Sequence, residues 1–194
     1  MLASQAQDIH LDIDAAVCQF RTDRASAVAR LNELFSHGLP PSPAMNGRYR
    51  GALLTTSVNP LLDGLAHALL SRWLPWKGKT FDAATQTGDN MFTNDGLWLS
   101  RLVFMGYRRY QADGEGRSRA LEFRTYVSPG QNDPGQPTLK LDYNLEVNPS
   151  FVVRDVLDEL VQVDSGYYLG KAHLHWRGRW RCAAYFTLEA TSAA

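Results

Sequence analysis

The sequence predicts a mainly β protein, an antiparallel β-barrel preceded by one helix and carrying a second helix after its first strand. Two observations carry this prediction. Clear helical periodicity is confined to the part of the chain before Pro75, in two segments. Beyond that point, several short segments rich in aromatic and branched residues are joined by tight turns that contain glycine. We therefore expect a closed barrel of about eight to ten strands.

The two helices are expected at 22–38 and 59–73. In the first, apolar residues recur at three- and four-residue steps, and Thr22 or Asp23 can cap its start. The second opens on Asn59-Pro60, in the cap and first-turn positions, and has one leucine-rich face. Residues 1–21 show no sustained period, so we expect a flexible arm there and a single barrel domain over 22–194.

The strands are expected at 76–81, 97–110, 120–127, 156–163, 167–176 and 179–189. Turns join several of them, at 113–116, 164–166 and 177–178. Gly106 is expected to mark a bulge in the longest strand, and 128–137 is expected to be a surface loop.

Composition limits the classes of function. The 194 residues carry 20 basic and 20 acidic side chains, so no net field favours nucleic acid or an anionic membrane. No apolar run reaches the roughly 18–20 residues that span a bilayer, and the start of the chain lacks a signal-peptide pattern. The two distant cysteines, Cys18 and Cys182, are typical of reduced thiols in a cytoplasmic protein. We expect no nucleic-acid partner and no membrane span.

The stretch Asn46-Gly47-Arg48-Tyr49-Arg50-Gly51-Ala52 places one aromatic ring between two arginines and two glycines. With the preceding prolines and the later Trp76-Lys77-Gly78-Lys79-Thr80-Phe81, it resembles the GXWXG family, small bacterial and fungal proteins named for a Gly-x-Trp-x-Gly motif. Tyr49 stands where that family has tryptophan. The family implies no settled activity, so no catalytic residue follows from it. The exchange of the ring favours a structural role for Gly47, Tyr49, Gly51, Trp76 and Gly78.

The same pentapeptide is similar to the first-strand signature of lipocalins, and this resemblance implies a lipocalin-like barrel. In lipocalins the ring closes the barrel floor, and an arginine of the last strand lies over it. The resemblance therefore implies that Arg179 or Arg181 covers Tyr49 through a cation–π contact.

Four polar residues are candidates for ligand contact. Arg124 and Tyr126 share one strand face and could hold a carboxylate if that face lines the lumen; the alternative is an exposed face with Glu122 as partner. His173 and His175 also share a face and lie about 6–7 Å apart at a rise of ~3.3 Å per residue. They could serve a metal site if His67, Asp158 or Glu159 supplied a third ligand. Lys171 lies on the same strand face, and a cation disfavours a metal beside it, so we expect no metal and no cofactor there.

We expect the lumen to bind a small hydrophobic or amphipathic ligand, fatty-acid-like or polyketide-like, with Trp98 and Tyr185 among the aromatic contacts. The alternative is an enzyme that uses the cavity for acid–base chemistry, such as an isomerase, cyclase or decarboxylase, with Asp155, Asp158 or Glu159 as the carboxylate. A filled barrel that serves as a protein–protein module is the third option. A homodimer is compatible with each.

Overall fold

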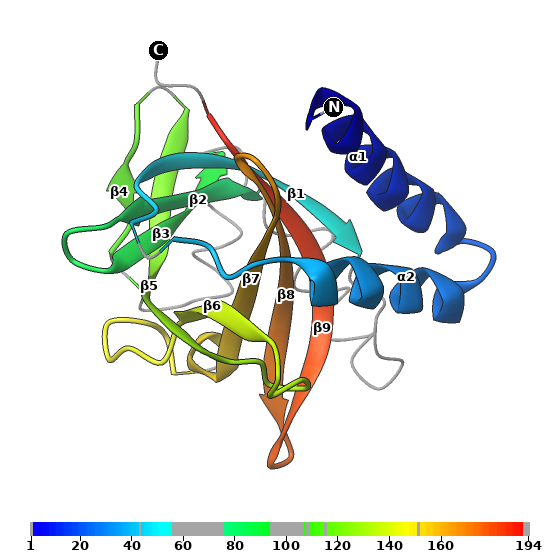
Figure 1. Ribbon diagram of the computed structural model, residues 1–194. Coiled ribbons are helices and arrows are strands. Elements are labelled where there is room, and N and C mark those ends of the chain that lie inside the picture. Colours follow the sequence, from blue (N-terminus) through cyan, green and yellow to red (C-terminus); the bar gives the residue numbers. More distant parts are fainter. Residues whose placement is uncertain are drawn as a thin grey trace.

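Eight antiparallel strands close into a barrel in the computed structural model of the protein (Figure 1). The structure describes residues 2–42, 44–55, 76–93, 107, 109–114, 116–150 and 152–191. The strands of the barrel are β1 Gly47–Thr55, β2 Trp76–Asp82, β3 Thr87–Thr93, β5 Arg117–Pro129, β6 Pro137–Asp142, β7 Val156–Asp164, β8 Tyr167–Trp176 and β9 Arg179–Ala190. The predicted fold class is confirmed. The helix expected at 59–73 and most of the strand expected at 97–110, with Gly106, lie outside the described residues.

The order around the barrel is β1-β2-β3-β5-β6-β7-β8-β9, and β9 pairs with β1 to close it. Strand β5 is long enough to pair with β3 along its first half and with β6 along its second half. A bulge at Leu121, whose φ is 59°, interrupts the half of β5 that pairs with β3. The short β4, Gln111–Ala112, pairs with the start of β5 on the edge opposite to β3. A 3₁₀ turn, Val153–Asp155, precedes β7.

Two helices precede the barrel, α1 at Leu2–Gln19 and α2 at Arg24–His37. Helix α2 was predicted, and Asp23 caps it by accepting a hydrogen bond from the Ser26 backbone N–H at 3.1 Å. The expectation of an arm without regular structure at 1–21 is wrong. The missed signal is the 4-3-4 spacing of Ile9, Ile13, Ala16 and Phe20, which places one apolar stripe on the helix.

The helices lie on one side of the barrel (Figure 1). Their buried residues pack on the outer face of β7, β8 and β9 and form a second core outside the lumen. This outer core consists of Ala16, Leu31, Phe35, Val161, Leu169 and Tyr185. No helix in the described ranges is long and apolar enough to cross a bilayer.

The lumen holds the main core, which is mostly aromatic and branched side chains from all sides of the barrel. Tyr49, Phe81, Phe123, Leu141, Tyr168 and Phe186 are among its members. A bulge in β9 at Ala183 reverses the face of the strand, because Ala172 pairs with Ala184 but His173 pairs with Cys182. Cys182 therefore lies with the outer core rather than with the lumen core.

Candidate functional site

A cluster of buried polar side chains lies inside the barrel among these apolar residues. It consists of Lys79 on β2, Asn90 on β3, Tyr143 just after β6, and Asp158 on β7. None of the four is more than 6% exposed. Removing such groups from water costs free energy that apolar side chains would not cost. The cluster is therefore the leading candidate for a functional site.

Strand register places the cluster in the lumen. Lys79 lies opposite Tyr49 of β1 and opposite Asn90 of β3, and residues that face each other on antiparallel strands share one side of the sheet. Asp158 lies opposite Leu141, a member of the lumen core. Residues far apart in the sequence thus converge because the barrel closes.

The Lys79 ammonium group has one acceptor for each of its three hydrogens. Its Nζ lies 2.9 Å from Oδ2 of Asp158, 2.8 Å from Oδ1 of Asn90 and 2.5 Å from the Tyr143 hydroxyl. The Trp76 indole donates a further hydrogen bond of 3.0 Å to Oδ1 of Asn90. One cation and one anion are in contact, so the cluster is neutral as a whole.

Burial controls the proton affinities in the cluster. It lowers the pKa of Lys79 because it disfavours the charged ammonium, and the attraction of Asp158 opposes this shift. Burial, and then the charge of Asp158, raise the pKa of Tyr143 well above its usual value, so this residue is a neutral phenol. The Lys79 ammonium also lies 5.2–5.5 Å from the ring centres of Trp76, Phe123, Tyr143 and Phe186.

This arrangement supports two kinds of chemistry. The Tyr143 hydroxyl lies 3.3 Å from Oδ2 of Asp158 and 3.2 Å from Oδ1 of Asn90, so a proton can pass between the phenol and a neighbouring acceptor. The same groups can offer hydrogen bonds to the polar end of a molecule that lies among the rings. Groups with shifted pKa values are frequent in sites of both kinds.

A second buried charged cluster lies on the outer face of β6, β7 and β8. Glu159 accepts hydrogen bonds from Lys140, from the Gln131 backbone N–H at 2.6 Å, and from His173 Nε2 at 2.9 Å. Burial alone would raise the pKa of Glu159, but hydrogen bonds from His173 and Lys140 and the charge of His173 lower it to about 2. His173 Nδ1 has no hydrogen-bond partner among the described residues. The cluster ties three strands to the 130–136 loop.

Arg124 and Tyr126 lie side by side as predicted, but on the outer face of the barrel. The Arg124 guanidinium contacts Oδ2 of Asp142 at 2.7 and 3.0 Å, and its carbon lies 5.7 Å from the Tyr126 ring centre. The Tyr126 hydroxyl lies 3.4 Å from the same carboxylate. The expected alternative partner, Glu122, is not the one that Arg124 uses.

The other expected ligand residues are not brought together. His173 lies in the outer cluster, and His175 is exposed near the end of β8, 4.0 Å from Asp155. Tyr185 lies under α2 and donates a 2.7 Å hydrogen bond to Asn32. Trp98 lies outside the described residues. Within the described part of the chain, no three His, Cys, Asp or Glu side chains are grouped to hold a metal ion.

The glycines of the sequence motif permit close contact between β1 and β2. A Cβ on Gly51 would lie 2.3 Å from the Trp76 ring, and a Cβ on Gly78 would lie 2.0 Å from the Tyr49 carbonyl oxygen. Gly78 also has a φ of 135°, which residues with a Cβ rarely adopt. Tyr49 is buried in the lumen, in edge contact with Phe81 and Tyr168. Gly47 has a positive φ of 85° at the start of β1.

The expected arginine lid over Tyr49 is wrong. Tyr49 lies opposite Ala190, near the end of β9, whereas Arg179 and Arg181 lie near its beginning. With ~3.3 Å per residue, nine or more positions along a strand separate them by roughly 30 Å. The motif arginines make ion pairs instead: Arg48 binds Asp113 at 2.5 and 2.6 Å, and Arg50 binds Glu189.

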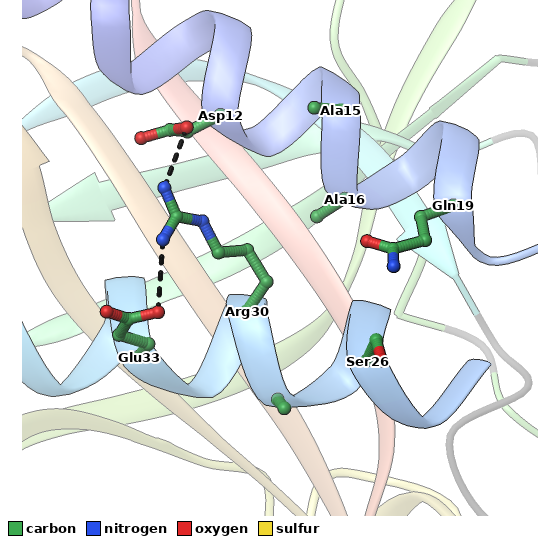
Figure 2. Close-up of a pocket in the computed structure, with 8 residues that line it drawn as sticks. Asp12, Ala15, Ala16, Gln19, Ser26, Arg30 and Glu33 are labelled. Atoms are coloured by element: carbon green, nitrogen blue, oxygen red, sulfur yellow. Dashed lines mark hydrogen bonds and ion pairs between the residues drawn. The ribbon is translucent and has the colours of Figure 1, made fainter. Parts of the chain in front are cut away.

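A groove of about 370 Å³ lies between α1 and α2 (Figure 2). Arg30 spans it, with contacts to Asp12 at 2.8 Å and to Glu33 at 3.1 Å. These three side chains are each more than 40% exposed, and the single cation is shared by the two carboxylates. The groove is therefore typical of helix–helix packing, and the lumen cluster remains the better candidate.

Sequence reasoning missed Lys79, Asn90 and Tyr143 as site residues, and it considered Asp158 only as one of several acids. Asn90 lies on β3, a strand that was not predicted, and Tyr143 follows β6, which was also missed. One signal was present at Lys79: on a strand it shares a face with Phe81, two positions later, which is a candidate core residue.

Comparison with known proteins supports the fold alone. No protein family and no curated protein matches the chain. A solved structure of a protein from Thermomonospora curvata is similar, with a TM-score of 0.51 and 18% sequence identity over 93% of this chain and 99% of that one. The resemblance to the GXWXG family stays a prediction.

Proposed function

We propose that the barrel lumen binds a small, mostly apolar molecule that carries an uncharged polar group, such as a hydroxyl or a carbonyl. The observation that carries this proposal is the buried Lys79–Asp158 pair with Tyr143 and Asn90 inside the barrel. Replacing a buried ion pair with apolar side chains is often neutral or stabilising. A role in recognition accounts for keeping the costly groups inside a barrel of eight strands, whose interior is either filled by side chains or able to hold one small ligand.

The charge balance of the cluster favours an uncharged ligand. Lys79 already faces Asp158 at 2.9 Å, so a ligand carboxylate would add a second anion beside this carboxylate in a site with little water. The surrounding rings of Trp76, Phe123 and Phe186 suit an apolar body.

Displacement of a neutral fluorescent probe tests the proposal. N-phenyl-1-naphthylamine is bound to the purified protein and then displaced by 1-decanol or by decanoate, which share the alkyl chain and differ in charge. We expect decanol to compete about tenfold more strongly, a difference of about 1.4 kcal/mol. Failure of the probe to bind, or stronger competition by decanoate, contradicts the proposal. Native mass spectrometry of the protein as purified identifies any molecule that it retains.

Two matched variants locate the binding site. Tyr143→Phe removes a hydroxyl from the lumen cluster, and Tyr185→Phe removes one from beneath α2. We expect the first to weaken decanol binding about tenfold through the lost hydrogen bond and the second to leave it unchanged. Equal losses in both variants would assign the effect to folding and not to the lumen.

Acid–base catalysis in the same lumen is the second candidate, favoured by the contact between the Tyr143 phenol and Asp158 beside Lys79. An isomerase, cyclase or decarboxylase moves a proton to or from carbon. A retained molecule incubated with the protein in D₂O should then gain deuterium, and Tyr143→Phe should abolish this gain. Retention of the molecule without any deuterium uptake leaves binding as the function.

A further inference from the structure

We propose that the tip of the β8–β9 hairpin docks on a lipid surface that carries negative charge. This tip comprises residues 175–181, His-Trp-Arg-Gly-Arg-Trp-Arg, which include three arginines and two tryptophans. Figure 1 shows the hairpin projecting beyond the other strands at one end of the barrel. The proposal is independent of what the lumen binds.

The turn at the tip is tight and places a cation at its apex. Trp176 pairs with Arg179, and the two residues between them have positive φ values, 51° at Arg177 and 74° at Gly178. A two-residue turn with this backbone favours Asn, Asp or Gly at its first position. The arginine there goes against local backbone preference, which points to a role for its side chain.

Each face of the hairpin tip combines an indole ring with a basic group. On one face Trp176, which is 41% exposed, lies opposite Arg179. On the other face the ring of His175 lies 5.1 Å from that of Trp180. On this face Asp155 Oδ1 lies 4.0 Å from His175 Nδ1.

The positive charge of the tip is not neutralised locally. Arg177, Arg179 and Arg181 form no ion pair with any residue that the structure describes. Three exposed arginines elsewhere have acidic partners, namely Arg30 with Asp12, Arg50 with Glu189, and Arg124 with Asp142, whereas Arg21 and Arg117 are exposed without an ion pair to a described residue but are not clustered. Three unpaired cations thus gather at one end of a chain whose formal net charge is zero.

A lipid surface fits this chemistry better than a nucleic acid does. Tryptophan rings settle at the level of lipid headgroups, and arginines beside them attract anionic headgroups. Nucleic-acid binding uses a groove or broad basic surface that follows several phosphates. The hairpin tip is narrow and projecting, so it suits insertion among headgroups.

Vesicle sedimentation tests the proposal with the full chain at low ionic strength. We expect binding to phosphatidylcholine vesicles that contain about 30% phosphatidylglycerol, weak binding to phosphatidylcholine alone, and loss of binding as salt is added. The double variant Arg177→Gln/Arg179→Gln should bind roughly 25-fold more weakly, about fivefold for each arginine. The control Arg21→Gln/Arg117→Gln removes the same charge from two exposed positions outside the hairpin tip and should bind like the wild type.

A second pair of variants tests the indole. Trp176→Ala should weaken vesicle binding severalfold, whereas Leu11→Ala, at a residue that is 60% exposed on α1, should not. Thermal unfolding confirms that each variant is folded. The proposal fails if the wild-type protein does not bind the anionic vesicles, or if both arginine double variants lose binding equally. It also fails if a single-stranded oligonucleotide binds the hairpin tip more tightly than the vesicles do.

Discussion

Lys79 illustrates how burial determines the loss of stability when one partner of an ion pair is removed. Its partner Asp158 is also buried, so Lys79→Met would leave a carboxylate in the lumen without its cation. We expect the free energy of unfolding to fall by about 3–5 kcal/mol. Arg50→Met makes the same kind of change in the exposed pair with Glu189 and should cost less than about 1 kcal/mol. Urea unfolding measures both.

The double variant Lys79→Met/Asp158→Leu checks the cause of this loss. Replacing both charges by apolar groups should recover most of the lost stability, because no buried charge is then left unpaired. If the double variant is as unstable as Lys79→Met alone, the loss comes from packing around the lysine and not from the orphaned carboxylate.

Glu159 should make the stability of the protein depend on pH in acid. Its pKa is lowered to about 2 in the folded protein, against about 4.3 in an unfolded chain. The stabilisation is complete above the unfolded value and is lost as pH falls toward 2, where the folded protein also binds the proton. At 1.36 kcal/mol per pKa unit, the lowered pKa of Glu159 contributes about 3 kcal/mol to the free energy of unfolding.

Glu159→Gln isolates this contribution. Urea unfolding at several values between pH 6 and pH 2 should show the difference between wild type and variant shrinking mainly below about pH 5. A difference that stays constant over this range would show that the Glu159 carboxylate does not titrate in the way that its contacts with Lys140 and His173 imply.

The candidate site could be predicted only in part from single residues. Asp158 was considered because a carboxylate has recognisable chemistry, but Lys79 and Asn90 acquire their role only through the β2–β3 pairing. Tyr126 and Tyr143 cannot be told apart by residue type. One is 38% exposed outside the barrel and the other is buried inside it, because burial depends on the face of the strand and on the bulges that reverse it.

At the scale of elements, helix α1 contributes a buried side chain, and the contribution of that side chain to stability can be tested. Ile13 is buried, so Ile13→Ala should lower the free energy of unfolding by about 2–5 kcal/mol through lost burial and a cavity. The same type of truncation at exposed Leu11 should change it by less than about 0.5 kcal/mol. Thermal or urea unfolding compares them. Equal small effects would mean that this helix adds nothing to the stability of the fold.

The β1–β2 contact depends on Gly78. An alanine there would combine a φ of 135° with a Cβ 2.0 Å from the Tyr49 carbonyl oxygen, so Gly78→Ala should cost more than about 3 kcal/mol. Gly116→Ala is the control, since that glycine also has a positive φ, 67°, but its Cβ would meet open space. Its cost should stay near 1 kcal/mol, as measured by urea unfolding. If the two variants lose similar amounts of unfolding free energy, the loss comes from backbone conformation alone and not from the close contact with Tyr49.

Elements with a strong internal pattern were predicted well. Strands β7, β8 and β9 are rich in branched and aromatic residues, and tight turns join them. Their predicted bounds agree with the structure within about a residue. Strands β3 and β6 were missed because Thr87–Thr93 and Pro137–Asp142 contain Gly, Asn, Asp or Pro, which weaken the strand signal. Their neighbours in the barrel impose the strand conformation on them.

For the whole molecule, closure of the barrel is what assembles the candidate site. Strands β2, β3 and β7 bring Lys79, Asn90 and Asp158 to the same interior, although β7 lies across the barrel from the other two. The sequence predicted a barrel from its count of short strands and turns, but the pairing between β3 and β5 that completes the ring depends on contacts between distant segments. Such contacts leave no local pattern in a single sequence.

The pairing of β1 with β9 also constrains how the protein is made. Arg50 and Glu189, which meet across this seam, are 139 positions apart. At roughly 5–20 residues per second of ribosomal synthesis, β1 waits about 7–30 s for its partner strand. During that interval its backbone is an open edge, to which another nascent chain could pair. The charges of Arg48 and Arg50 lie on that edge, and charged residues there discourage such pairing. We therefore expect the two arginines that later form ion pairs to discourage such pairing of the growing chain as well.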